Sequence, residues 1–338
     1  MNTYTLTPQL LTNISMVERL YGQLEALHLP KKLQLNLERD NLVQSSYISN
    51  SIEGNPLTFP EVSNLLLGDR VPTTRSEQEV RNYFDILKNL HVRAREPFTL
   101  QTILDIHREL IEDLDEDIAG IIRDDRVVVG KHIVQDGKVK LRVKHEPPYH
   151  DRISINRVLQ ELVNWYNAPS DMLPLVKVGM FHHYYVHIHP FTDGNGRTVR
   201  LLTALLFIKA GYAINKYFVL DDYYDLNRKG YSDALHTADT GDSTGWLEYF
   251  ILGTKYSLQS ALSKSKNALL TLNVSERPTA REQDVLKLFA TSTDLTTADV
   301  AKALGVSRQQ AQSLLAGLVE KGLVEKFGST KSSYYRVA

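Results

Sequence analysis

The residues best suited to chemistry lie together between His189 and Arg200, in the segment HPFTDGNGRTVR. The ordinary pKa of histidine suits His189 to take a proton from an attacking hydroxyl group near neutral pH. Asp193 offers a hard carboxylate oxygen for Mg²⁺, the usual companion of nucleotide phosphates. An acid/base group and a metal ligand so close in the chain indicate a reaction on a phosphorylated substrate.

The rest of this segment is suited to hold the phosphates. Gly194 and Gly196 let backbone N–H groups approach an anion closely, and the N-terminus of the helix predicted to follow favours negative charge. Arg197 and Arg200 share a face of the first helical turn, where two cations oppose the helix dipole but can grip a polyphosphate. The alternative is a glycine-rich surface loop, and so many consistent residue types in one short segment weigh against it.

Amphipathic helices are predicted to position this segment. Apolar residues recur three and four positions apart over residues 10–28, 34–53, 60–67, 76–94, 101–113, 152–167, 172–188 and 197–210. One β-hairpin interrupts them, because the valine-rich runs 127–129 and 139–143 flank Asp136-Gly137, a dipeptide suited to a tight turn. The sequence therefore predicts a mainly α fold with one hairpin.

The C-terminal part is predicted to form a separate small module. Composition shifts near residues 263–280, and helices are predicted at 281–290, at 297–304 and, capped by Ser307, up to Lys321. Strands 323–327 and 334–337 can pair around Gly328-Ser329, an order that resembles a winged helix-turn-helix domain. We expect three parts: an N-terminal helical region at 1–95, a catalytic core at 96–262 and the winged helix at 275–338.

The composition excludes several classes of protein. The formal net charge of -1 gives the chain no overall attraction to nucleic acid or anionic membrane. The lack of cysteine excludes disulfides, thiolate metal sites and cysteine nucleophiles. The first residues do not resemble a secretory signal, and no apolar run is long enough to span a bilayer. We therefore expect a cytoplasmic protein.

The segment from His189 to Arg200 also matches every specified position of HPFx(D/E)GNGRxxR, the core pattern of the Fic (filamentation induced by cAMP) family. The chain resembles this family over residues 40–260. The resemblance implies a helical core that transfers AMP from ATP to Ser, Thr or Tyr side chains of proteins with the help of Mg²⁺. The implied roles are His189 as the base with Asn195 as a second catalytic residue, Asp193 as the Mg²⁺ ligand, Gly194–Gly196 as the phosphate cradle, and Arg197 and Arg200 as ligands of the β- and γ-phosphates.

A second match to this family lies at the end of the helix predicted over residues 34–53. The segment SNSIEG, from Ser49 to Gly54, resembles the inhibitory motif (S/T)xxxE(G/N). The resemblance implies that Glu53 pairs with Arg200 and prevents productive binding of the γ-phosphate. The alternative is a solvated helix-terminal carboxylate followed by Gly54 as the C-cap.

Two further segments resemble the family where it borders the nucleotide and the target. Val129, Gly130, Lys131 and His132 resemble the strand that leads into a flap, and the Asp136-Gly137 hairpin is the flap against which an extended target peptide can align. Tyr231 and Asp239 resemble positions near the nucleobase, although asparagine is common where Asp239 falls. The alternatives are a plain surface hairpin and a core tyrosine.

Two other patterns leave alternatives open. His183 and His187 have the i,i+4 spacing of zinc helices, but the sequence indicates no third ligand, so we expect His183 to support the core and His187 to be a packing or surface residue. The third helix of the C-terminal module carries Arg308, Gln309, Gln310, Gln312 and Ser313, which can read DNA bases, and the wing adds Lys326, Lys331 and Arg336. Because the module is not strongly basic, docking of a protein is an equal alternative.

The sequence therefore favours a protein adenylyltransferase that Glu53 inhibits. One alternative is a DNA-binding regulator that senses ATP. Another is de-adenylylation, or a different nucleotide or phosphate transfer, on the same fold. The expected partner is a target protein with a reactive hydroxyl, including the chain itself, and a homodimer is left open.

Overall fold

The computed structural model describes residues 2–135, 138–214, 216–271, 277–290, 292–328 and 333–337, without the side chains of residues 131–142, 144 and 271. The hairpin turn Asp136-Gly137 and the wing residues Ser329 and Lys331 lie outside the described residues. The chain forms two compact units: Met1–Arg19 with Asp40–Leu258, and Leu20–Arg39 with Gln259–Ala338. Within the described residues, none of the helices is long and apolar enough to cross a membrane.

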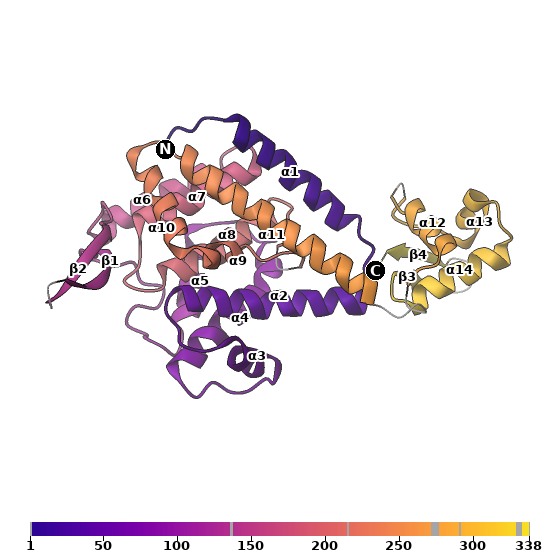
Figure 1. The fold of residues 1–338 in the computed structure, drawn as a ribbon, viewed down its shortest axis with the longest axis horizontal. Coiled ribbons are helices and arrows are strands. Elements are labelled where there is room, and N and C mark those ends of the chain that lie inside the picture. Colours follow the sequence, from indigo (N-terminus) through magenta and orange to yellow (C-terminus); the bar gives the residue numbers. More distant parts are fainter. Residues whose placement is uncertain are drawn as a thin grey trace. The chain divides into compact units, whose positions relative to one another are not determined.

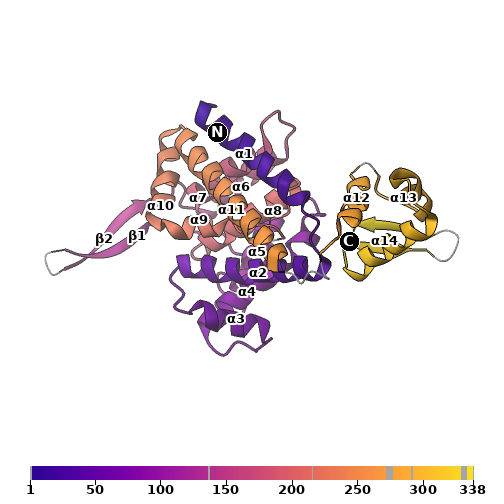
Figure 2. The same ribbon diagram turned by 45° about the vertical axis from the view of Figure 1, so that its right-hand side comes forward.

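Helices build most of the fold (Figure 1). They are α1 (Pro8–Glu25), α2 (Lys31–Ile52), α3 (Phe59–Leu67), α4 (Arg75–Arg93), α5 (Leu100–Ile111), α6 (Arg152–Asn167), α7 (Pro174–Ile188), α8 (Asn195–Lys209), α9 (Asp221–Leu226), α10 (Arg228–Thr237), the 3₁₀ helix η1 (Ala238–Thr240) and α11 (Thr244–Thr271). Between α5 and α6, strands β1 (Val129–Gln135) and β2 (Lys138–His145) form an antiparallel hairpin. Figure 2 shows this hairpin extending away from the helices of its unit.

Helices α7 and α8 form the centre of the first unit and carry the candidate site between them. Most residues of both helices are buried, and the buried residues lie on all sides of each helix, as expected for core helices that are not amphipathic. Gly179 allows α11 to pack closely on α7, because a Cβ there would lie 2.9 Å from Phe250 and 3.0 Å from Leu247. The Trp246 indole N–H donates to the Gly179 carbonyl at 2.7 Å. This close packing holds α7, the helix that leads into the loop, against α11.

The second unit contains the C-terminal module. It consists of α12 (Ala280–Leu288), α13 (Thr297–Leu304), α14 (Arg308–Glu320) and the antiparallel strands β3 (Val324–Phe327) and β4 (Tyr334–Val337). Thr279, Thr296 and Ser307 each begin a helix with a capping box. Val300 and Leu315 are among the residues of a small core of its own. The predicted winged helix is confirmed.

The predicted mainly α class is confirmed, and the differences are local. Strand β1 begins at Val129, so the prediction that Val127 and Val128 belong to the strand is wrong. Helix α11 continues through Ser263–Lys266, where the composition indicated the approach of a boundary. Helices α9, α10 and α11 were not predicted. Helices α9 and α10, with six and ten residues, are too short for an apolar spacing to repeat, and α11 is long but only weakly amphipathic.

Candidate active site

His189 stands at the junction between α7 and the loop that leads to α8. It caps α7 in the left-handed conformation, with φ 50°, and its N–H donates to the Tyr185 carbonyl at 3.0 Å. Only a few non-glycine residues adopt this conformation, and such strain is concentrated at functional sites. Burial, followed by the positive charges of His145 and Arg123, lowers the pKa of His189 to about 4. The imidazole is therefore neutral at pH 7 and able to accept a proton.

The loop after His189 is closed by its own hydrogen bonds. The side chain of Asn195 donates to the Phe191 carbonyl at 2.7 Å and accepts from the Phe191 N–H at 3.0 Å. Gly194 has φ 74°, and a Cβ there would lie 3.2 Å from Ile111. Asn195 and Gly194 thus give the loop its shape, and this shape determines where its backbone N–H groups point.

Two residues from outside the motif support the loop and were not predicted. Arg123 is buried and donates to the carbonyls of His189 at 2.8 Å and Tyr149 at 2.7 Å. His107 stacks on Phe191 with ring centroids 3.6 Å apart, and its Nε2 lies 3.0 Å from the Asp193 carbonyl oxygen. Burial lowers the pKa of His107 to about 4. No sequence pattern singles out His107, because a single histidine in a helix is usually a packing residue.

Arg200 is bound by the end of α2 through Nε and Nη2. Its Nε donates to Ser49 Oγ at 2.7 Å, and its Nη2 donates to the Ser49 carbonyl at 2.9 Å and to Glu53 Oε1 at 2.8 Å. Burial alone would lower the pKa of Arg200. The negative charge of Glu53 and other nearby acidic groups outweigh burial and raise this pKa. Glu53 also lies against the loop, because a Cβ on Gly196 would collide with its carboxylate. Gly54, with φ 93°, ends the segment.

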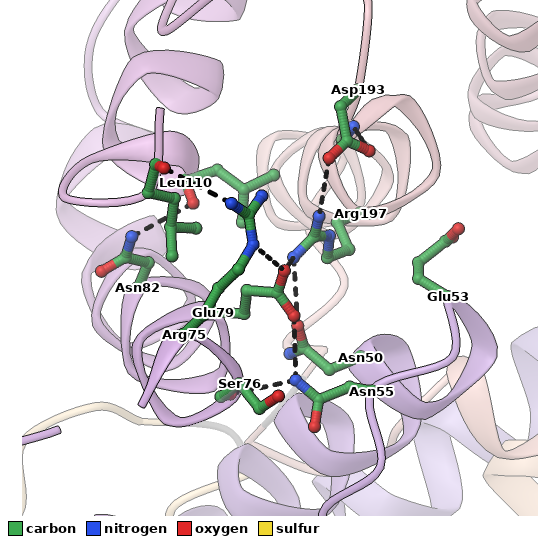
Figure 3. A network of polar contacts seen from close by, with 12 residues as sticks. Asn50, Glu53, Asn55, Arg75, Ser76, Glu79, Asn82, Leu110, Asp193 and Arg197 are labelled. Atoms are coloured by element: carbon green, nitrogen blue, oxygen red, sulfur yellow. Dashed lines mark hydrogen bonds and ion pairs between the residues drawn. The ribbon is translucent and has the colours of Figure 1, made fainter. Parts of the chain in front are cut away.

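Arg197 is also surrounded by polar groups, although more loosely (Figure 3). Its guanidinium nitrogens lie 3.5 Å from Asn50 Oδ1, 3.7 Å from Glu79 Oε1 and 3.8 Å from Asp193 Oδ2. Glu79, which the sequence did not single out, accepts a hydrogen bond from Asn55 at 2.9 Å. The long distances leave Arg197 able to turn toward an anion without losing a close ion pair.

Asp193 offers a carboxylate to the solvent. Its side chain is 54% exposed, and Oδ1 accepts the N–H of Gly194 at 2.6 Å. Oδ2 makes only the long contact with Arg197 within the described part of the chain. An exposed, oriented carboxylate with a free oxygen fits a hard divalent cation such as Mg²⁺.

Many of the predicted residues meet at one cavity of about 290 Å³. The predicted residues in its lining are Glu53, Val129, Gly130, His189, Asn195, Gly196, Arg200 and Tyr231. Ser49, Gly54, Asp193, Gly194, Arg197 and Asp239 lie outside this lining, and the side chains of Lys131 and His132 are not among those described. The cavity therefore has the proposed base, one arginine and Glu53 at the same surface.

Tyr231 and Asp239 differ in how they relate to this cavity. Tyr231 lines it and is also a core residue, because its hydroxyl lies 2.7 Å from Nε2 of the buried His182. Asp239 lies outside the lining and is contacted by four histidines, His145, His183, His187 and His236. Burial alone would raise the pKa of Asp239, but hydrogen bonds from these histidines outweigh burial and lower the pKa.

Two family models match this chain. Residues 97–207 match the Fic/DOC family, and residues 279–330 match the MarR family. The first range contains the loop with His189 and Asn195, and the second contains α12 to β3.

Relatives and solved structures agree with these matches. The chain is 29% identical over 255 residues to "Protein adenylyltransferase Fic" of Culex quinquefasciatus, which covers 71% of this chain and 46% of the relative. It is 28% identical over 258 residues to "Protein adenylyltransferase fic-1" of Caenorhabditis briggsae, with 72% and 46% covered. The chain thus spans about half the length of the curated relatives it matches.

The fold itself is shared with solved structures. A Fic family protein from Desulfovibrio desulfuricans G20 aligns over 100% of this chain and 98% of its own, with a TM-score of 0.67 and 23% identity. Fic-1 (residues 134–508) from C. elegans aligns over 75% and 71%, with a TM-score of 0.61 and 24% identity.

Proposed function

We propose that this chain, whose residues 97–207 match the Fic/DOC family and whose residues 279–330 match the MarR family, transfers AMP from ATP to a Ser, Thr or Tyr hydroxyl of a protein. The relatives named as protein adenylyltransferases support this activity. The observation that carries it is the cavity in which neutral His189, Gly196 and Arg200 meet. The direct test is intact-mass analysis for AMP additions after incubation with ATP and Mg²⁺.

The proposed reaction is an in-line substitution at the α-phosphorus. The hydroxyl oxygen of the target forms a bond to this phosphorus while the bond to the bridging oxygen of the β-phosphate breaks, and pyrophosphate leaves. His189 takes the hydroxyl proton, which its lowered pKa permits because the ring is neutral at pH 7. The N–H groups of Asn195 and Gly196, with Arg197 and Arg200, would hold the phosphates and stabilise the negative charge of the leaving group, while the Gly194 N–H stays with Asp193.

Mg²⁺ fits this site through Asp193, which has the free, exposed carboxylate oxygen described above. The ion would neutralise phosphate charge. We predict that Asp193→Asn raises the Mg²⁺ concentration needed for half-maximal AMP transfer by about tenfold or more, because its single oxygen stays with the Gly194 N–H and an NH₂ group, which cannot bind Mg²⁺, replaces the free carboxylate oxygen. The amide still accepts the Gly194 N–H, so the loop keeps its shape. A magnesium titration of AMP transfer measures the shift, with the exposed Asp171→Asn as the control. An unchanged titration in Asp193→Asn would remove Asp193 from the metal site.

We further propose that the chain is autoinhibited, because Glu53 occupies the arginine that the γ-phosphate needs. Binding of ATP in the productive position would then require Glu53 to leave Arg200.

We propose DNA binding as a second function, for the C-terminal domain alone. The match to the MarR family and the exposure of Arg308, Gln309 and Gln312 on α14 favour it. Two predicted contacts are less available: Gln310 accepts the Ser307 N–H at 3.0 Å, and Arg336 pairs with Asp294.

A DNA selection from random duplexes, followed by fluorescence anisotropy, tests this function. We predict that Gln309→Ala combined with Gln312→Ala weakens binding to the selected sequence about 10- to 100-fold, because two base contacts are lost. Glu320→Gln, on the last turn of the same helix, is the control. Binding that is equally weak for every duplex would favour a protein-docking domain instead.

A further inference from the structure

A cluster of metal-ligating side chains lies beside the cavity, at the base of the hairpin. His145 comes from β2, His187 from α7 and Asp239 from η1, and one ligand atom of each lies within 4.8 Å of the others. His187 Nδ1 is 2.9 Å from Asp239 Oδ1, and His145 Nδ1 is 3.5 Å from Asp239 Oδ2. In a tetrahedral zinc site with bonds near 2.0 Å, ligand atoms are about 3.3 Å apart, so these separations require only small side-chain rotations to close on an ion.

The hydrogen bonds of His145 place either a second proton or a metal ion between its Nδ1 and Asp239. Its Nε2 lies 3.1 Å from the carbonyl oxygen of His187, which can only accept, so Nε2 carries a proton. In a neutral imidazole the other nitrogen, Nδ1, then presents a lone pair, and this lone pair faces the carboxylate of Asp239. Two electron-rich groups in contact repel each other unless a second proton or a metal ion lies between them.

The surroundings have the features of a metal site. A histidine ligand commonly donates its second ring N–H to a backbone carbonyl, as His145 does to His187, and this contact fixes the ring. His183 is buried, and its Nε2 lies 3.3 Å from Asp239 Oδ1, so it can hold the carboxylate in position. His145 is only 8% exposed, while Asp239 at 27% and His187 at 31% leave a path from the solvent.

We propose that His145, His187 and Asp239 bind a divalent transition-metal ion of the Zn²⁺ class, with the fourth position open to water or to a group in the cavity. Imidazole nitrogen with one carboxylate is a ligand set that favours Zn²⁺ and Co²⁺ over Mg²⁺. The ion would tie β2 to α7 and η1, and so fix the hairpin at the edge of the cavity. This site is separate from the Mg²⁺ site proposed at Asp193 and does not depend on AMP transfer.

Co²⁺ is the probe, because its visible absorption reports on coordination geometry. The full chain, without a polyhistidine tag and freed of metal with a chelator, is titrated with Co²⁺ and then with Zn²⁺. We expect one Co²⁺ per chain with the intense absorption of a four-coordinate ion, displaced by Zn²⁺. His187→Ala and Asp239→Asn are each expected to weaken binding by more than about tenfold, because losing a ligand costs at least as much as losing its supporting contact.

Control variants keep the test independent of folding. The exposed His150→Ala should bind Co²⁺ like the wild type. Asp239→Asn preserves shape, so its circular dichroism and melting temperature without metal show whether it folds. If the wild-type chain gives no such absorption at a Co²⁺ excess, or if Asp239→Asn and His187→Ala bind as tightly as it does, the proposal is overturned and His145 holds its second proton instead.

Discussion

Glu53→Gly is expected to raise AMP transfer about 10- to 100-fold, because it removes a charged hydrogen bond that competes with the γ-phosphate for Arg200. The Glu53 carboxylate accepts from Arg200 Nη2 at 2.8 Å and lies against Gly196, where a phosphate would have to pass. The contacts of Arg200 with Ser49 are not altered by this change, so the guanidinium stays in place and only its anion-binding side is freed. Gain of activity on removal of a side chain is a result that damage to the fold cannot produce.

The measurement is intact-mass analysis over time with ATP and Mg²⁺, on the purified chain and on added cell lysate proteins. Glu53→Gln separates the effect of charge from that of bulk and should give a smaller increase. Glu112→Gly is the matched control, since Glu112 also directly follows a helix, α5, and is exposed. If Glu53→Gly adds AMP no faster than the wild type, the inhibitory role of Glu53 is wrong.

The same assay is run in the reverse direction, because Glu53 can also orient a water molecule toward an AMP-modified side chain. Product made by the Glu53→Gly variant is incubated with wild type, with and without Mg²⁺. Loss of the added mass only with wild type would make removal of AMP the main activity, with Glu53 as a participant and not only as an inhibitor.

The local motifs of this protein could be predicted from its sequence, because each depends on neighbouring residues. The loop from His189 to Arg200 owes its form to glycines, a proline and capping geometry, all of which are encoded within a few positions. The helices could be predicted where one face is apolar, as in α4 and α5. The pairing of Glu53 with Arg200 was expected only from a family resemblance, since no local pattern connects two residues so far apart in the chain.

Contacts between distant segments could not be predicted. Arg123, His107 and Glu79 support the loop or Arg197 through backbone carbonyls and single ion pairs, and such partners leave no periodic signal. The i,i+4 spacing of His183 and His187 is typical of zinc helices, but the sequence alone indicates no third ligand. The hairpin and η1 bring His145 and Asp239 to the same place, and only the tertiary fold determines this.

His189→Ala is expected to reduce AMP transfer by about 10²- to 10⁴-fold, the usual contribution of a positioned general base. The change is best made in the Glu53→Gly background, where the rate is high enough for a large loss to be measured. Because the imidazole is neutral and its position is fixed by the cap of α7, it can accept the proton of the attacking hydroxyl without reorganising. Alanine keeps the helix but has no group that can take the proton.

A loss of activity alone would not distinguish a base from a packing residue, so binding and turnover are measured separately. The phosphate-holding groups, Gly196 and Arg200, are untouched, and we therefore expect the KM for ATP to change by less than about threefold while kcat carries the loss. His150→Ala in the same background should leave both constants unchanged, because this exposed histidine is remote from the loop in sequence and outside the cavity lining. A variant that lost ATP binding as strongly as turnover would indicate that His189 shapes the pocket, and the base would then have to be sought elsewhere in the cavity.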